Sequence, residues 1–333
     1  MMDLTTRYLG LELPHPLMPG ASPMADELDS VRRLEDAGAA AIVMRSLFEE
    51  QLAAEQLATV SHYEGIADAF AEANSYLPAP EEFALGPDEY LDQLLSIRGA
   101  VDLPIIASLN GVEGGYWLQY AQLIAEAGAD ALELNVFDIE TDSDISGARL
   151  EERLLQMVRS LRTQLSIPIT VKLSPFYTAF LNLATQIEQH GADGVVLFNR
   201  FFQADLNLEQ LEVERQLRLS TSDELPLRLR WLAILSGKVE GLSLAVTGGV
   251  HTVDDAIKAL ACGADAVQVV SALLIHGPEA LVGLRQGIAD WLEANEYESL
   301  DQLRGSMNVA RCPDPTIYER ANYIHMLHNF RPV

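Results

Sequence analysis

Short apolar runs alternate along the chain with longer segments whose apolar residues recur at helical spacing. The runs cover residues 16–22, 40–46, 104–109, 131–136, 169–173, 194–199, 242–247 and 266–271. Most are apolar throughout, which is typical of parallel strands that are covered on both faces. Helical patterns cover residues 26–37, 87–97, 116–127, 150–165, 179–190, 227–239, 253–262 and 278–294. The chain therefore reads as eight strands, each associated with a helix.

One junction recurs between a helix and the strand that follows it. Its copies are Ala37-Gly38-Ala39-Ala40, Ala127-Gly128-Ala129-Asp130, His190-Gly191-Ala192-Asp193 and Cys262-Gly263-Ala264-Asp265. Glycine supplies the left-handed residue that ends a helix, and the chain then enters the next strand directly. We predict an α/β protein with a (β/α)8 barrel, because a doubly wound sheet would favour a GxGxxG motif where the first strand is followed by Gly20-Ala21-Ser22-Pro23.

No break in composition marks a second domain, so residues 1–333 are predicted to form one domain. Two insertions, 47–88 and 200–226, leave the predicted carboxyl ends of strands, where barrel enzymes build their sites. Residues 295–333 form a C-terminal appendage whose aromatic side chains could pack on the barrel or on a partner subunit, which makes a homodimer an open expectation.

Composition narrows the classes of partner. The 22 basic and 49 acidic side chains give a net charge of −27, which repels nucleic acids and anionic membranes at long range. The two cysteines make neither a disulfide framework nor a zinc motif, so no metal is expected. Neither a signal peptide nor a membrane span is evident, and we expect a cytoplasmic protein that acts on a small molecule.

The clearest chemical signal follows the last two predicted strands. Gly248 and Gly249 end the seventh strand, and Val270 and Ser271 end the eighth. Barrels often bind a phosphate with these loops, since glycines let backbone N–H groups approach an anion and a serine adds a hydroxyl. A tight turn without any ligand is the alternative interpretation.

Other polar residues end the remaining strands. Lys172 lies in an apolar strand, which favours a ligand contact over a snorkelling or salt-bridged lysine. Arg45 either faces an anionic ligand or forms an ion pair with Glu49 or Glu50. The amides that could bind a planar imide, or cap a loop, are Asn110, Asn135 and Asn199.

The chain resembles the dihydroorotate dehydrogenases, and is most similar to their soluble, dimeric branch. The motifs that carry the resemblance run in order over residues 4–295 and include Leu132-Glu133-Leu134-Asn135, Val171-Lys172-Leu173-Ser174-Pro175 and Thr247-Gly248-Gly249-Val250. The resemblance implies FMN at the mouth of the barrel, with Ala21 and Ser22 along the flavin ring and Lys172 at its N1/O2 edge. It further implies a phosphate site of Gly248, Gly249, Val270 and Ser271, and pyrimidine-binding amides at Asn74, Asn135 and Asn199.

Two departures from the family pattern concern the reaction. Asp138 stands where the soluble members have the cysteine base that removes a proton from the substrate, and Glu140 stands where they have an asparagine. An aspartate with its ordinary pKa of about 3.9 is a far weaker base than a thiolate of about 8.5. Arg45 replaces the usual lysine at a cofactor-binding position, with the same charge but a different geometry.

The resemblance leads us to expect an FMN-dependent oxidation of dihydroorotate to orotate, with Asp138 and Lys172 as catalytic residues. The acidic segment Asp138, Glu140, Asp142 and Asp144 would repel the carboxylate of that substrate, so a flavin oxidoreductase with another substrate is one alternative. The other is a barrel that binds a phosphorylated ligand without redox chemistry, with Lys172 as a Schiff-base lysine.

Overall fold

The computed structural model describes residues 2–48, 51, 86–111, 116–137, 139–200, 204–214, 217–320, 322–329 and 331. Its centre is an eight-stranded parallel sheet in the order β3-β12-β11-β8-β7-β6-β5-β4. The two ends of this order meet, because the Ala40 N–H donates to the Leu17 carbonyl at 3.0 Å. The sheet is thus a nearly closed barrel, as the sequence predicts. The strands are β3 Leu17–Pro19, β4 Ile42–Phe48, β5 Ile105–Asn110, β6 Ala131–Asn135, β7 Ile169–Leu173, β8 Gly194–Leu197, β11 Ser243–Thr247 and β12 Ala266–Val269.

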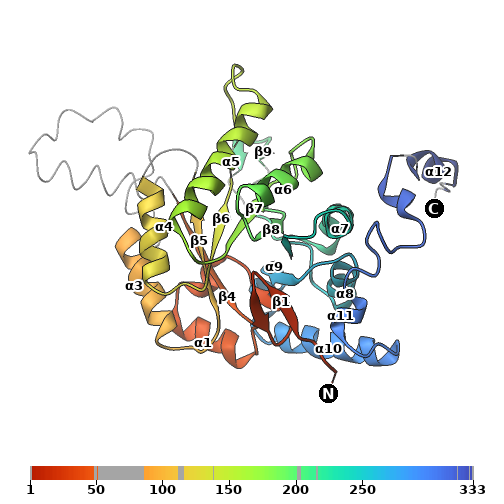
Figure 1. Cartoon of the computed structure of the whole chain (residues 1–333), viewed down its shortest axis with the longest axis horizontal. Coiled ribbons are helices and arrows are strands. Elements are labelled where there is room, and N and C mark those ends of the chain that lie inside the picture. The colour runs from red at the N-terminus through yellow and green to blue at the C-terminus, as the bar shows by residue number, and fades with distance from the viewer. Residues whose placement is uncertain are drawn as a thin grey trace, which may run out of the picture.

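Helices follow the strands and surround the barrel (Figure 1). They are α1 Leu28–Asp36, α3 Pro87–Arg98, α4 Tyr116–Glu126, α5 Gly147–Gln164, α6 Phe180–Gln189, α7 Leu225–Ser236, α8 Val253–Ala261 and α10 Ala280–Ala294. The eighth predicted strand ends early, since Ser271 begins the short helix α9 (Ser271–His276). The remaining elements are the 3-10 turns η1 Pro23–Ala25, η4 Ser222–Glu224 and η5 Pro315–Tyr318 and the helices α11 Leu300–Leu303 and α12 Asn322–Asn329. No helix in the described ranges is long and apolar enough to cross a membrane.

The recurring junction has a structural reason beyond its glycine. Gly38, Gly128, Gly191 and Gly263 all have positive φ, as predicted. In three copies the aspartate that follows accepts a hydrogen bond from an N–H at the start of the preceding strand: Asp130 from Ile105, Asp193 from Ile169 and Asp265 from Leu244, at 2.7–2.8 Å. Each of these carboxylates also pairs with an arginine. The aspartates therefore fasten neighbouring strands together at the amino-terminal end of the barrel.

A hairpin that the apolar pattern did not predict closes this amino-terminal end. Strands β1 (Thr6–Tyr8) and β2 (Leu11–Leu13) pair antiparallel and insert Tyr8 and Leu9 into the barrel. The fully buried Tyr8 hydroxyl donates to the Thr170 side chain at 3.4 Å. With Met18, Val43, Ile106, Ala131, Val196, Ala245 and Ala266 these residues form an apolar cluster inside the barrel.

Just after the hairpin, the imidazole of His15 is buried in one tautomer. The Leu17 N–H donates to Nδ1 at 3.2 Å, so the proton lies on Nε2, which donates to the Gly38 carbonyl at 2.7 Å. Burial lowers the pKa of His15 to about 4, against the opposing effect of the Gly38 carbonyl. This neutral histidine fixes the entry of β3 against the loop that follows α1.

Candidate functional site

Most of the described candidate residues lie at or just beyond the carboxyl ends of strands, whereas Arg45 lies in the middle of β4. Register places three of them side by side, because Asn110 pairs with Asn135 and Asn135 with Lys172 across β5, β6 and β7. Two residues earlier, Ser108, Glu133 and Thr170 form the next paired row. Because side chains alternate between the faces of a strand, both rows point to the same side as the barrel's interior cluster.

Glu133 is the centre of a buried polar group that sequence reasoning did not single out. Its side chain is fully buried, and Oε1 lies 3.3 Å from the Lys172 ammonium. Oε2 accepts a hydrogen bond of 2.6 Å from Gln268 Nε2, which reaches over from the opposite strand β12. A charged pair this deep is stable only when both partners are held. Lys172 is therefore salt-bridged and buried, and its position is fixed by Glu133.

The asparagines form a connected set above this pair. Asn110 donates to the Asn135 carbonyl at 2.8 Å, and Asn135 Nδ2 donates to Ser46 Oγ at 2.8 Å. Asn199, just after β8, donates to Asn135 Oδ1. Asn135 is thus fixed from β4, from β5 and from the segment just after β8. The loop-capping interpretation does not describe it, since these partners belong to other parts of the barrel.

The glycine pair after β11 forms a tight turn in the left-handed backbone region. Gly248 and Gly249 have φ of 77° and 83°. A Cβ on Gly249 would lie 2.7 Å from the backbone nitrogen of Leu225, the first residue of α7, and one on Gly248 would lie 2.8 Å from Arg228 Nη2. The buried Arg228 guanidinium is held by the Thr247 and Glu224 carbonyls at 2.5 and 2.7 Å. A cation and a helix start therefore stand directly behind the two glycines.

Two serines complete this corner. The Gly249 N–H donates to Ser220 Oγ at 3.1 Å, and the Ser220 hydroxyl donates to Ser271 Oγ at 2.9 Å. His251 Nε2 lies 3.4 Å from the same Ser220 oxygen. Ser220 comes from the second insertion and was missed at the sequence level, because a serine among polar residues carries no pattern. Val270 lies beside Gly20, whose Cβ would meet its side chain at 2.7 Å.

The comparisons with known proteins point in one direction. The sequence profile described as dihydroorotate dehydrogenase matches residues 68–292, well over half of the chain. The chain belongs to the dihydroorotate dehydrogenase family. It is thus a member of a family of flavin oxidoreductases.

Individual relatives are distant and differ in what they are named for. The chain is 25% identical over 309 residues to the dihydroorotate dehydrogenase B (NAD(+)) catalytic subunit of Methanothermobacter thermautotrophicus, covering 91% of this chain and 97% of that one. It is 23% identical over 316 residues to the protein of the same name from Thermoplasma acidophilum, covering 92% and 99%. It is also 22% identical over 325 residues to the NAD-dependent dihydropyrimidine dehydrogenase subunit PreA of Escherichia coli, covering 92% and 77%.

The residues around the glycine pair and Gly20 offer polar groups of the kind that a phosphate and a planar ring such as those of FMN need. The glycine pair, Ser220 and Ser271 gather N–H and hydroxyl groups at one corner, and the buried Arg228 packs so closely behind the glycines that a Cβ on either would meet the protein. Gln268 Oε1 is a buried acceptor without a partner among the described residues, and it lies next to Gly20, which leads into Ala21 and Ser22. Unpaired buried acceptors are costly, so a donor on a bound ligand would satisfy it.

Arg45 has a partner that the sequence did not suggest. Its guanidinium pairs with Asp26 at 2.7 Å, where a pair with Glu49 or Glu50 was considered; those two glutamates lie outside the described residues. Burial raises the pKa of Asp26, against the opposing effect of Arg45. The Arg45 side chain is a third exposed.

Two of the predicted site residues, the candidate base and one of the amides, are not among the residues that the structure describes. Asp138 and Asn74 lie outside the described residues. Beyond Asp138, the exposed carboxylates of Glu140 and Asp142 accept hydrogen bonds from the N–H groups of Asp142 and Asp144, at 2.9 Å each. These carboxylates therefore cap their own turns, as expected of a solvated loop.

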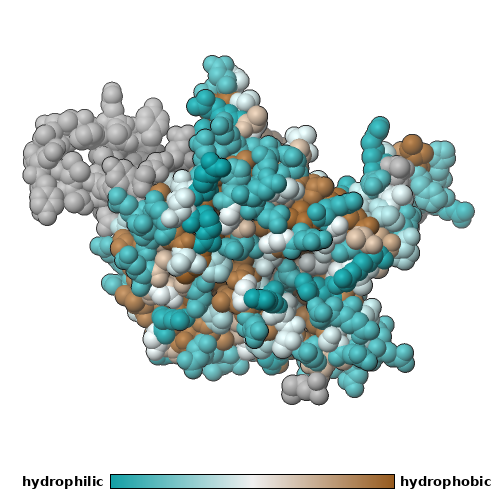
Figure 2. Space-filling view, viewed as in Figure 1, coloured by the Kyte–Doolittle hydropathy of each residue, from teal (hydrophilic) through white to brown (hydrophobic). Residues whose placement is uncertain are grey.

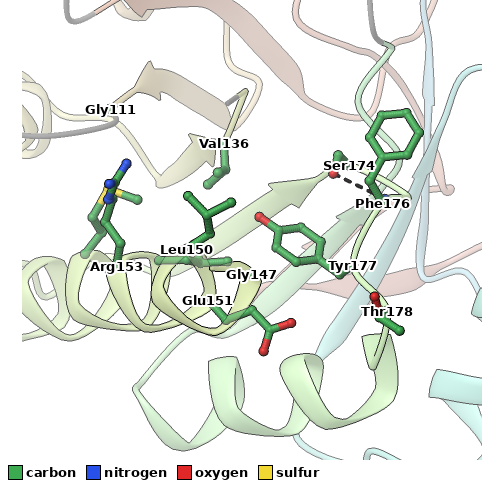
Figure 3. A pocket seen from close by; sticks show the side chains of 12 residues that line it. Gly111, Val136, Gly147, Leu150, Glu151, Arg153, Ser174, Phe176, Tyr177 and Thr178 are labelled. Atoms are coloured by element: carbon green, nitrogen blue, oxygen red, sulfur yellow. Dashed lines mark hydrogen bonds between the residues drawn. The ribbon is translucent and has the colours of Figure 1, made fainter. Parts of the chain in front are cut away.

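A cavity of about 160 Å³ lies next to these strand ends, between α5 and the segment after β7 (Figure 3). Val136, Leu150 and Leu154 give it an apolar wall, and Ser174, Tyr177 and Glu151 add polar groups. The Ser174 hydroxyl accepts from the Phe176 N–H at 3.4 Å. A larger space of about 480 Å³, lined by Thr6, Glu12 and Arg304, lies at the amino-terminal end, away from the candidate site.

Proposed function

We propose that this chain binds FMN at the carboxyl end of the barrel and oxidises a reduced pyrimidine, with dihydroorotate as the first candidate and orotate as its product. The observation that carries the proposal is the fixed row of Asn135 and Lys172 above Glu133, across the barrel mouth from the glycine–serine cradle. FMN supplies the hydride acceptor when it is bound. The pair with Glu133 also favours this function over a Schiff-base lysine, which needs a neutral amine.

In this proposal the chain's own residues bind and orient. The Gly248 N–H and the Ser271 hydroxyl donate to the phosphate, while Gly249, whose own N–H donates to Ser220, lets the backbone pass close to it. Lys172 places a cation at the edge of the flavin where negative charge develops. Asn135 and Asn199 orient the amide edge of the pyrimidine, and Asp138 is the candidate that accepts a proton from the substrate carbon.

A second substrate is supported by a specific observation. The segment after Asn135 contains Glu140, Asp142 and Asp144. Their carboxylates repel a substrate that carries a carboxylate of its own. A neutral dihydropyrimidine avoids this repulsion, and one relative is named for dihydropyrimidine dehydrogenase. The acidic loop therefore favours dihydrouracil as the competitor to dihydroorotate.

An anaerobic visible spectrum of the FMN-reconstituted protein tests both substrates. Dihydroorotate should bleach the flavin band, and faster bleaching by dihydrouracil would favour the neutral substrate. Bleaching by neither would leave a flavoprotein with another reductant. A protein that takes up no FMN would refute the proposal itself. Riboflavin serves as the control for uptake, since it lacks only the phosphate.

A further inference from the structure

One carboxylate of this acidic protein stands inside the barrel, out of reach of water. Most of the described acidic side chains lie at the surface, where water and salt weaken their fields, and hydrophilic residues cover much of the face seen in Figure 2. Glu133 is fully buried, and its partners Lys172 and Gln268 are almost fully buried as well. Its charge therefore acts at a low effective dielectric on whatever lies close to it.

The fold alone gives no reason for a charged layer at this level. Barrel interiors are usually filled by layers of apolar side chains, and such a cluster, with Tyr8 and Leu9, occupies the interior nearer the amino-terminal end. A buried ion pair is often no more stabilising than well-packed apolar residues of the same volume. Neither Glu133 Oε1 nor Gln268 Oε1 accepts a hydrogen bond from any residue that the structure describes. This layer is costly, which points to a role beyond holding the barrel together.

The field of Glu133 reaches groups around it. Burial is the main cause that raises the pKa of Tyr8 and of Tyr90, and the Glu133 carboxylate adds to the rise at both. Both phenols are therefore neutral and do not offset its charge, and the cation that faces it is Lys172, whose Nζ lies 3.3 Å from Oε1. At an effective dielectric of about 20, unit charges as far as about 10 Å apart still shift each other's equilibria more than tenfold.

We propose that Glu133 lowers the reduction potential of the bound flavin by neutralising Lys172. The inference rests on the FMN site proposed above. A hydride brings two electrons and one proton to the flavin and leaves one additional negative charge on its ring, which a cation at the ring edge stabilises. A lysine that already has a buried counter-ion attracts this charge less than a free lysine does. The flavin therefore accepts a hydride less readily and passes its electrons on more readily.

The test is the two-electron reduction potential of FMN bound to the full chain, measured by anaerobic equilibration with reference dyes. E133Q removes the charge and keeps the shape of the side chain. It should favour reduced over oxidised FMN at least about tenfold, a rise of about 30 mV. E133D keeps a carboxylate but withdraws it from Lys172, so the rise should be smaller, about threefold. T170V is the matched control, because Thr170 is buried beside Glu133 on β7 and carries no charge. It should shift the equilibrium less than about twofold.

The sign of the shift separates neutralisation from mere placement. If Glu133 only holds Lys172 in position, E133Q frees the lysine from the flavin edge and the potential falls. A fall, or a shift no larger than that of T170V, would overturn the inference. If E133Q does not fold by far-UV circular dichroism, E133D decides by the same sign, since it leaves Lys172 a carboxylate. A wild type that takes up no FMN would overturn the proposed function together with this inference, whereas FMN uptake with an unshifted potential in E133Q overturns the inference alone.

Discussion

Replacing Glu133 by glutamine tests whether the buried pair positions Lys172. Glu133 is fully buried and its carboxylate is the counter-ion of an ammonium that is 7% exposed. Glutamine can still accept the Gln268 hydrogen bond, but it leaves the Lys172 charge without a partner. Removing one member of a buried ion pair costs about 3–5 kcal/mol of unfolding free energy. At about 2.1 cal/mol/K per residue over 333 residues, a loss of 3 kcal/mol lowers the Tm by roughly 4 °C.

A double-mutant cycle in urea separates the pair from ordinary packing loss. The proteins are wild type, E133Q, K172M and E133Q/K172M, all without flavin so that ligand binding does not add to stability. Methionine keeps the length of the lysine stem and removes its charge, so the double variant contains no unpaired buried charge. We expect it to recover most of the stability that either single variant loses, so the coupling energy should be larger than either single loss, about 3 kcal/mol or more.

Two results would contradict a positioning role for Glu133. One is that the losses of unfolding free energy in the two single variants simply add, and the other is that E133Q unfolds within about 0.5 kcal/mol of the wild type. Either result would mean that water or another group compensates Lys172, and Glu133 would then have no role in fixing the lysine.

Three further predictions concern the glycine–serine cradle and the barrel base. G249A should lose about 1–3 kcal/mol in urea unfolding, because φ is 83° and the new Cβ would lie 2.7 Å from the Leu225 nitrogen; an unchanged midpoint would contradict the strained turn. S271A should weaken FMN about tenfold by fluorescence titration and leave riboflavin unchanged, and equal losses for both flavins would remove Ser271 from the phosphate site. As the pH falls from about 6.5 to about 4, the free energy of unfolding of the wild type should decrease by up to about 3 kcal/mol relative to that of H15Q. The reason is that His15 binds a proton in this range in the unfolded chain but not in the folded one. Parallel urea curves for the two proteins at pH 7 and pH 5 would show that His15 does not resist protonation.

Much of the barrel could be read from the sequence because parallel strands and their helices carry strong periodic signals. Residues 169–173 were predicted with the bounds that β7 has, and the junction glycines have the predicted conformation. The β1–β2 hairpin and the hairpin of β9 (Asp205–Asn207) and β10 (Glu212–Glu214) were not predicted, since three-residue strands are too short for alternation to stand out. The first hairpin is stabilised by a contact far away in the chain, between Tyr8 and Thr170.

Site residues could be predicted where their type is unusual for the segment that contains them. They could not be predicted where their role depends on a partner far away in the sequence. Lys172 was conspicuous as a cation in an apolar strand, whereas Glu133 in the preceding strand was read as part of a motif and not as its counter-ion. Arg45 was recognised as a cation, but its partner Asp26 belongs to another strand-to-helix loop. Ser220 has no local signal at all, because its position follows from how an insertion folds back onto Gly249 and Ser271.

The division between the proposed cofactor side and the proposed substrate side explains how the departures from the family pattern can coexist with the family's barrel. The groups proposed for the flavin are fixed by buried contacts that reach several strands: Lys172 by Glu133, Gly249 by the start of α7, and Ser271 by Ser220. A change at any of them disturbs the barrel itself. The carboxylates after β6 bond only to their own turns and are exposed, so substitutions there cost the fold little. Substitutions in this loop can therefore change the choice of substrate while the barrel and the residues proposed for the flavin stay the same. Comparing anionic dihydroorotate with neutral dihydrouracil in the anaerobic spectrum tests this loop directly.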